Sequence, residues 1–166
     1  MEWPDPGNLN KRAIYERALQ HYLERNLADR IRSFEALSPR DAIAAFFEGI
    51  VKRSLGDRER KGCMLVNAAL EVAPHDPGLR KIVIEVFAEI EAFFLVHVRA
   101  GQANGTITRC LPATTLARHL LRVLMGIRVL ARVRPEQDLL ESVVAASLAL
   151  LGNGEGGMEN EKASLN

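Results

Sequence analysis

Histidine and cysteine are the residues of this sequence whose spacing could indicate metal or nucleophilic chemistry. The histidines, His21, His75, His97 and His119, are scattered and form no HExxH motif. Protein zinc ligands are closely spaced or paired on one helix face, so this pattern predicts no metal site. The sequence also contains no GxSxG, Walker or GxGxxG motif, the usual signatures of a serine nucleophile or a phosphate-binding loop. We therefore expect no metal, no cofactor and no enzymatic activity.

The two cysteines, Cys63 and Cys110, are far apart and in no CxxC spacing, which argues against a disulfide scaffold and fits a reducing compartment. Cys63 and Asn67 are four residues apart in the run CMLVNAALEVA, so on a helix they share one face. In one interpretation, Cys63 is a small buried hydrophobe and Asn67 bridges neighbouring helices. In the other, both form the polar corner of an apolar ligand pocket.

In the pocket interpretation, residues from other parts of the chain, most of them aromatic or apolar, also line the site. Phe46 and Phe47 are adjacent, so we expect only one of them, Phe46, to point straight inward. The predicted ligand pocket is lined by Tyr22, Phe46, Cys63, Asn67, Phe87, Glu91, Phe94 and Met125.

Glu91 raises a separate question, because it shares a helix face with Phe87 and Phe94. A carboxylate among aromatic rings is costly unless it is paired or hydrated. It could select a cationic ligand, or it could form a structural ion pair with Arg118 or Arg122.

Composition limits what surrounds these residues. The chain has 166 residues, 48% of them hydrophobic, and a net charge of +1, which predicts a single globular domain without a global positive field for nucleic acid or membranes. Neither a signal peptide nor a membrane span is indicated, so we expect a cytoplasmic protein. Most basic residues should lie on solvated faces, including the cluster Lys52, Arg53, Arg58, Arg60 and Lys61 and the series Arg118, Arg122, Arg128 and Arg132.

Apolar residues recur at three- and four-residue steps, and the alternation typical of strands is absent. The sequence therefore predicts an all-α fold of about six helices. Ser38 before Pro39 and Asp76 before Pro77 provide N-caps followed by a proline at the first helical position. We expect the fourth helix to be central. The predicted helices span 11–37, 39–55, 62–73, 77–104, 112–133 and 135–151.

The last two predicted helices are joined by a short turn and should form an antiparallel hairpin. Their apolar surface exceeds what the pair could bury by itself, which predicts a second subunit and a four-helix bundle about a twofold axis. The residues expected at this homodimer interface are Leu120, Leu124, Ile127, Val144 and Leu148.

Three segments resemble the C-terminal domain of TetR/AcrR-type transcriptional regulators: KGCMLVNAALEVAPHDPGLRKIV, RAGQANGTI and LARHLLRVLMGIRVLARV. The likeness extends over about 11–151. The resemblance implies a ligand-binding domain that dimerises through its last two helices and encloses a pocket for a small, mainly apolar effector. This function is the principal prediction for the chain.

TetR-type regulators place a helix-turn-helix headpiece before this domain, and such a headpiece needs on the order of 40 residues. We therefore expect 1–10 to be an irregular remnant, 11–151 to be the ligand-binding and dimerisation domain, and 152–166 to be a disordered tail. DNA would be read only through a headpiece supplied elsewhere. The alternative function is a headpiece-less interaction protein that heterodimerises with a full-length regulator and inhibits it.

Overall fold

The computed structural model describes residues 13, 16–19, 34 and 36–152, and within this part of the chain every regular element is a helix. The all-α prediction is confirmed. The elements are α3 (Pro39–Gly56), α4 (Met64–Asn67), the π-helix η2 (Ala68–Val72), α5 (Pro77–Asn104), α6 (Ala113–Val133) and α7 (Gln137–Leu150).

The predicted helix starts are confirmed where capping residues mark them. Ser38 accepts a hydrogen bond from the backbone N–H of Asp41 at the start of α3. Asp76 accepts from the backbone N–H groups of Gly78 and Leu79 at the start of α5, at 2.9 and 3.1 Å. These bonds satisfy amides that have no partner inside the first turn of a helix. Gly105, at a φ of 81°, ends α5 in the left-handed conformation that glycine adopts without steric cost.

The predicted third helix, 62–73, differs from the structure in its start and in its winding. It begins at Met64 and has only one α-helical stretch of four residues before the π-helix Ala68–Val72. The backbone N–H of Ala73 reaches back five residues to the carbonyl of Ala68, at 2.8 Å. Apolar periodicity cannot distinguish this wider winding from an α-helix, because their hydrogen bonds differ in span by only one residue, five against four.

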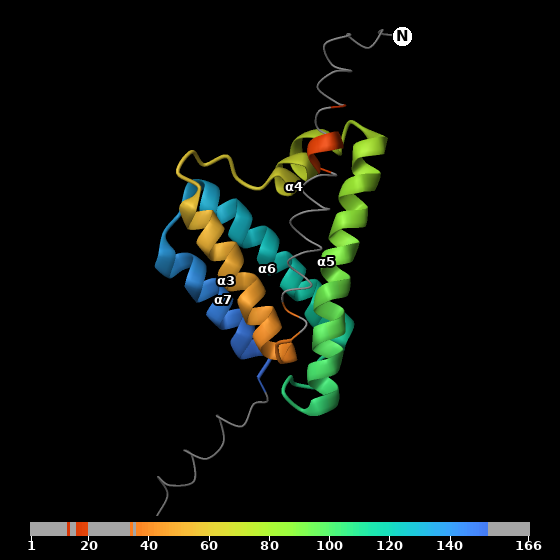
Figure 1. Cartoon of the computed structure of the whole chain (residues 1–166), viewed down its shortest axis with the longest axis vertical. Helices are drawn as coiled ribbons and strands as arrows, with labels where there is room; N and C mark the ends of the chain where they lie inside the picture. The colour runs from red at the N-terminus through yellow and green to blue at the C-terminus, as the bar shows by residue number, and fades with distance from the viewer. Residues whose placement is uncertain (1–12, 14–15, 20–33, 35, 153–166) are drawn as a thin grey trace, which may run out of the picture.

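The helices form a bundle in which α3, α6 and α7 run side by side and α5 leans across one edge (Figure 1). α6 packs against α3, α4, α5 and α7, whereas α5 packs against α3, α6 and η2. Among the described elements, α5 and α6 each pack against several others, so the central position predicted for 77–104 is shared with α6. Near the end of the bundle, the backbone N–H of Thr108 donates to the carbonyl of Leu151, which joins the α5–α6 loop to α7.

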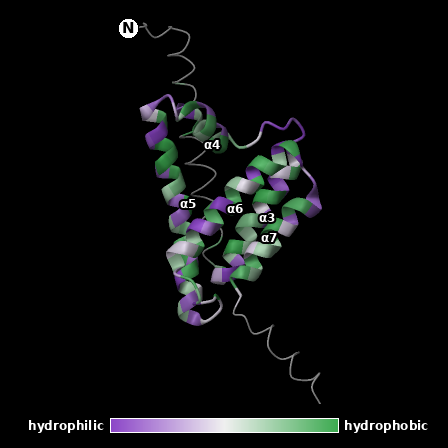
Figure 2. Cartoon of the chain, turned by 180° about the vertical axis from the view of Figure 1, so that it is seen from behind, coloured by the Kyte–Doolittle hydropathy of each residue, from purple (hydrophilic) through white to green (hydrophobic). Residues whose placement is uncertain are grey.

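Hydrophobic side chains from all of these helices form one core. Each fully buried Leu, Ile or Phe side chain contributes about 1.5–3 kcal/mol relative to an exposed one. In contrast, the loop of residues 57–62 between α3 and α4 is almost entirely hydrophilic (Figure 2). The largest fully buried side chains are Phe46, Phe47, Phe94, Leu19, Ile43, Leu79, Ile107, Leu116, Leu120, Ile127, Leu140 and Leu151.

Three residues predicted at the dimer interface lie in this core. Leu120 and Ile127 have no exposed surface in the single chain, and Leu124 is 4% exposed. All three belong to the core that α6 forms with the other helices of its own chain. Their own chain therefore covers these three side chains, and their place at a subunit interface stays a prediction.

Several predictions concern residues outside the described part. Residues 13 and 16–19 are helical, as expected, but most of the predicted first helix, including Tyr22, is not described. The same holds for residues 1–10 and for the predicted tail beyond Gly152. Among the described helices, none combines the length and the apolar character needed to cross a membrane.

Candidate ligand-binding site

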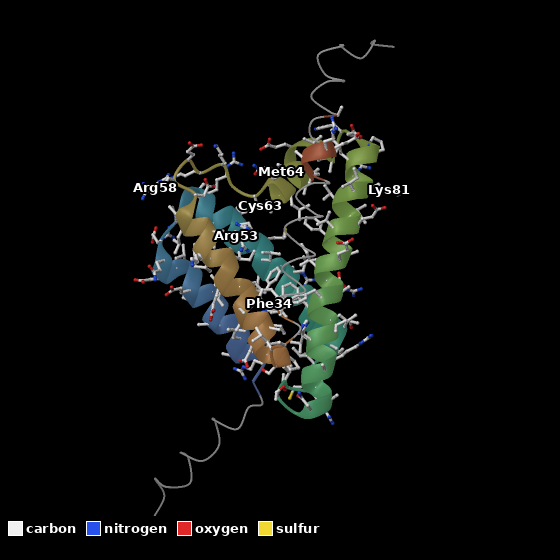
Figure 3. The ribbon with its side chains drawn as sticks, in the orientation of Figure 1. Phe34, Arg53, Arg58, Cys63, Met64 and Lys81 are labelled. Atoms are coloured by element: carbon white, nitrogen blue, oxygen red, sulfur yellow. The ribbon has the colours of Figure 1, made fainter. Side chains whose placement is uncertain are left out.

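Phenylalanine side chains from α3 and α5 meet at the centre of the bundle. The ring centroid of Phe46 lies 5.3 Å from that of Phe93 and 5.1 Å from that of Phe94. The Phe34 ring, which precedes α3, lies 6.4 Å from Phe46 and 6.0 Å from Phe93. Figure 3 shows Phe34 between the ribbons of α3 and α5. These edge-to-face and tilted arrangements are the favoured ones for aromatic pairs.

Phe46 and Phe47 are both buried, at 2% and 0% exposure, so the expectation that only Phe46 points inward is wrong for Phe47. The Phe47 ring stacks on Phe94 with centroids 5.6 Å apart and an interplanar angle of 11°. Both can be buried because α3 is covered on more than one side, by α5, α6 and α7. A sequence shows which residues are apolar but not how many neighbours surround their helix.

His97 lies at the edge of this aromatic cluster. Its ring centroid is 4.4 Å from that of Phe93, one turn earlier on α5, and its Nδ1 is 2.9 Å from the Phe93 carbonyl oxygen. A nitrogen that binds its own helix in this way is a structural contact. In the described part of the chain, no His, Cys, Asp or Glu residues are grouped as a metal would require.

Glu91 is paired across the α5–α6 contact. The Nε of Arg118 donates to the Glu91 carboxylate at 3.1 Å. Of the two interpretations of Glu91, this supports the structural ion pair and assigns it to Arg118 rather than Arg122. Phe87 on the same face and Met125 on α6 are partly buried and pack against the core.

Cys63 and Asn67 occupy the junction of the α3–α4 loop, α4 and α6. The Asn67 side-chain amide donates to the Lys61 carbonyl at 3.0 Å, and its Oδ1 accepts from Nη1 of Arg132 at 2.9 Å. Asn67 therefore bridges neighbouring segments, as the first interpretation of this residue predicts. Cys63 is 8% exposed and belongs to the core.

A cavity of about 340 Å³ opens at this junction. Cys63 and Met64 lie where the loop meets α4, and Arg58 lies farther back along the loop (Figure 3). We call this cavity the basic pocket, because its wall carries four cationic side chains and one carboxylate. The lining residues are Arg53, Ser54, Asp57, Lys61, Gly62, Cys63, Met64, Arg128, Ala131 and Arg132.

Asp57 organises the loop side of the basic pocket. Its Oδ2 accepts a hydrogen bond from the backbone N–H of Gly62 at 2.7 Å. This bond, with smaller contributions from the backbone and charge of Lys61 and the charge of Arg128, lowers the pKa of the Asp57 carboxyl below its ordinary value. Gly62 adopts a φ of 75°, so the turn that presents its N–H to Asp57 favours glycine.

The cations of the basic pocket come from two parts of the sequence: Arg53 and Lys61 lie at or near the α3–α4 loop, and Arg128 and Arg132 lie on α6. Arg53, Lys61 and Arg132 are exposed, as expected for solvated faces, and Arg128 is partly buried, but the sequence does not predict that all four line one cavity. The only local signal is the spacing of Arg128 and Arg132, which places them on one face of α6. Of the predicted pocket residues, Cys63 lies in this cavity, and Phe46 and Phe94 lie in the aromatic cluster.

A second, wider groove of about 570 Å³ separates α3 from α7. Two residues predicted at the dimer interface, Val144 and Leu148, line it. Both residues therefore line a groove whose other wall is α3. Val144 is buried, and Leu148 keeps part of its surface exposed. The groove is also lined by Glu48, Val51, Lys52, Leu55, Gln137, Glu141 and Ala145.

The arrangement of these helices corresponds to that of known transcriptional regulators. Residues 39–147, from the start of α3 to most of α7, match the family described as tetracyclin repressor-like, C-terminal domain. The chain thus belongs to the TetR family of regulators, through its C-terminal domain, and to a class of regulators rather than enzymes. This confirms the family resemblance expected from the sequence.

Two relatives extend this comparison. The chain is 34% identical over 148 residues, 85% of its length and 74% of the other's, to the uncharacterized HTH-type transcriptional regulator YezE of Bacillus subtilis (strain 168). A cysteine mutant of the TetR family transcriptional regulator CifR, complexed with double-strand operator DNA, superimposes with a TM-score of 0.72 at 28% identity. That similarity covers 87% of this chain and 79% of CifR.

Proposed function

We propose that this chain is the effector-sensing and homodimerising domain of a TetR-type regulator. In this function, two copies associate through α6 and α7, each copy binds a small, mainly apolar effector, and occupancy changes how a DNA-reading headpiece is presented. An effector alters DNA affinity only by its preference for one arrangement over another, typically about 1–3 kcal/mol. The family membership and the surface of the α6–α7 hairpin support the proposal.

The observation that carries the proposal is a set of exposed apolar residues on the two helices of this hairpin. On α6, Val129 and Val133 are one turn apart and are 46% and 66% exposed. On α7, Ala146 and Leu150 are also one turn apart and exposed. We call these four residues the hairpin face. Apolar side chains in such rows, beside small residues that permit close approach, are typical of helices that pack on a second subunit.

Light scattering of single-residue variants tests the dimer. Val133→Glu and Val129→Glu should convert the dimer to monomer, because a carboxylate buried between two apolar helices is strongly unfavourable. Val96→Glu is the matched control, since Val96 is 63% exposed on α5 and should leave the dimer intact. A wild-type monomer, or dimers of unchanged mass in both hairpin variants, would refute this interface.

For the effector, the proposal places an apolar ligand beside the partly buried residues Phe87, Glu91 and Met125 and the aromatic cluster that includes Phe46 and Phe94. Nile red, a neutral apolar dye, is a suitable probe because its fluorescence rises in an apolar environment. We expect saturable binding that Phe87→Ser weakens and Val96→Ser does not. Native mass spectrometry of the purified protein provides a second measurement, in which a retained small molecule is expected. Binding of Nile red that is absent, or equal in both variants, would argue against effector sensing here.

A further inference from the structure

We propose that the basic pocket is a second ligand site, separate from the aromatic cluster, and that it binds a small molecule bearing a carboxylate or phosphate group. None of the aromatic cluster residues lines this cavity. The proposal goes beyond effector sensing and dimerisation, because it assigns an anionic ligand class to a site that an apolar effector does not require.

Charge is the first argument. Arg53, Lys61, Arg128 and Arg132 line the cavity with Asp57 as the only carboxylate in its wall. Two further carboxylates lie nearby, because Glu59 pairs with Lys61 and Glu71 is 3.8 Å from Arg132. With both counted, four cations and three carboxylates gather at the basic pocket. Like charges gathered around a partly enclosed space repel one another, and a bound anion relieves that repulsion.

Positioning is the second argument. Arg128 and Arg132 are one turn apart on α6, and each is held by a different neighbour. Nη1 of Arg128 donates to the hydroxyl of Ser54 at 3.1 Å, and Ser54 is only 5% exposed. Nη1 of Arg132 donates to Asn67 at 2.9 Å. Because a guanidinium carries several N–H donors in a planar fork, the bond to Ser54 or Asn67 leaves further donors for a carboxylate or phosphate, which at Arg132 would compete with Glu71.

The shape of the cavity favours a small molecule over a nucleic-acid backbone. Cys63, Met64 and Ala131 add apolar lining to the basic pocket beside its charges, and a volume of about 340 Å³ is in the lower range of small-molecule sites. Gly62 closes one side: a Cβ at this position would lie 3.4 Å from Cδ of Arg132, so the loop backbone passes close to that side chain. A cavity with mixed polar and apolar walls suits an organic anion better than a sugar-phosphate chain.

Isothermal titration calorimetry with inorganic phosphate and with succinate, at ionic strength matched with sodium chloride, tests the site. We expect saturable binding of at least one of these probes. Arg132→Gln should weaken it by about tenfold, the effect of losing one charge-assisted hydrogen bond. Arg128→Gln should act in the same direction. Each substitution also breaks an anchoring bond, to Asn67 for Arg132 and to Ser54 for Arg128, so the folding of both variants is checked by circular dichroism. Arg99→Gln, which changes an exposed arginine on α5 outside the pocket, should bind as the wild type does.

Three outcomes would overturn the proposal. The first is the absence of saturable heat with both probes, and the second is equal affinity in the folded Arg132→Gln and Arg99→Gln variants, which would indicate general ionic effects. The third is binding only to a short double-stranded DNA, lost when salt is raised, which would assign the arginines to phosphate-backbone contact. The light-scattering test needs no ligand, so the failure of this proposal and the failure of the proposed dimer are distinguishable.

Discussion

Arg118 on α6 donates through Nε to the carboxylate of Glu91 on α5, at 3.1 Å, and so joins two helices across 27 positions of the sequence. The Arg118 side chain is 63% exposed and that of Glu91 is 31% exposed. Solvent competes strongly for such a pair, so Glu91→Gln should lower the free energy of unfolding by less than about 1 kcal/mol. Urea denaturation measures this difference, with Glu89→Gln on the exposed side of α5 as the control. A loss of several kcal/mol would show that Glu91 has a larger role than this pair.

Gly101 lies so close to Ile107 that position 101 has no room for a side chain. A Cβ at position 101 would lie 2.5 Å from Cδ1 and Cγ1 of Ile107, which is completely buried. Gly101→Ala should therefore destabilise the fold by about 1–3 kcal/mol, the usual cost of overpacking. Thermal unfolding checks this. Gly56→Ala is the control, because nothing lies within 4 Å of its added methyl group, and the pair Gly101→Ala, Ile107→Val should recover part of the loss.

The ionised Asp57 carboxyl should stabilise the folded protein, and this stabilisation should be lost at low pH. Its pKa is lowered in the folded protein, chiefly by the Gly62 N–H, so the ionised form favours folding. This stability is present above the ordinary value of 3.8 and is lost as the pH falls through the lowered folded pKa. Wild type should therefore melt at a higher temperature than Asp57→Asn at pH 6, and the difference should shrink below about pH 4. A difference that stays constant down to pH 3 would contradict this role.

Truncation of the buried Phe46 should lower the free energy of unfolding more than truncation of the partly buried Phe87. The Phe46 ring touches Phe34, Phe47, Phe93 and Phe94, and Phe46→Ala should cost about 3–5 kcal/mol. Phe87, which is only partly buried, provides the comparison and should cost less. If urea denaturation gave the same loss for the Phe46 and Phe87 variants, the burial and ring contacts of Phe46 would add no stability beyond that of Phe87.

The helix boundaries could be predicted because their signals are local. Ser38 with Pro39, and Asp76 with Pro77, cap helices within one turn of sequence, and the structure contains both caps. Gly105 ends α5 for a similarly local reason. Such signals depend on the chain's own hydrogen bonds and need no knowledge of what packs where.

The candidate sites could not be predicted in this way, because they depend on which helix covers which face. Periodicity shows that Leu120 and Ile127 lie on an apolar stripe, but not that this stripe faces their own chain. Likewise, Arg53 and Arg132 meet in one cavity although they are far apart in sequence. The bond between Asn67 and Arg132 could not be predicted for the same reason, because the two residues are 65 positions apart in sequence.

The last two turns of α6 alternate between two surfaces: Arg128 and Arg132 line the basic pocket, whereas Val129 and Val133, each the next residue along, lie on the hairpin face. A helix turn is too rigid for one surface to shift without the other. Binding in the pocket and association of subunits would therefore be linked by mass action, and by reciprocity each would change the equilibrium constant of the other. The apparent affinity of this pocket would then vary with protein concentration, as it would not in a permanent monomer.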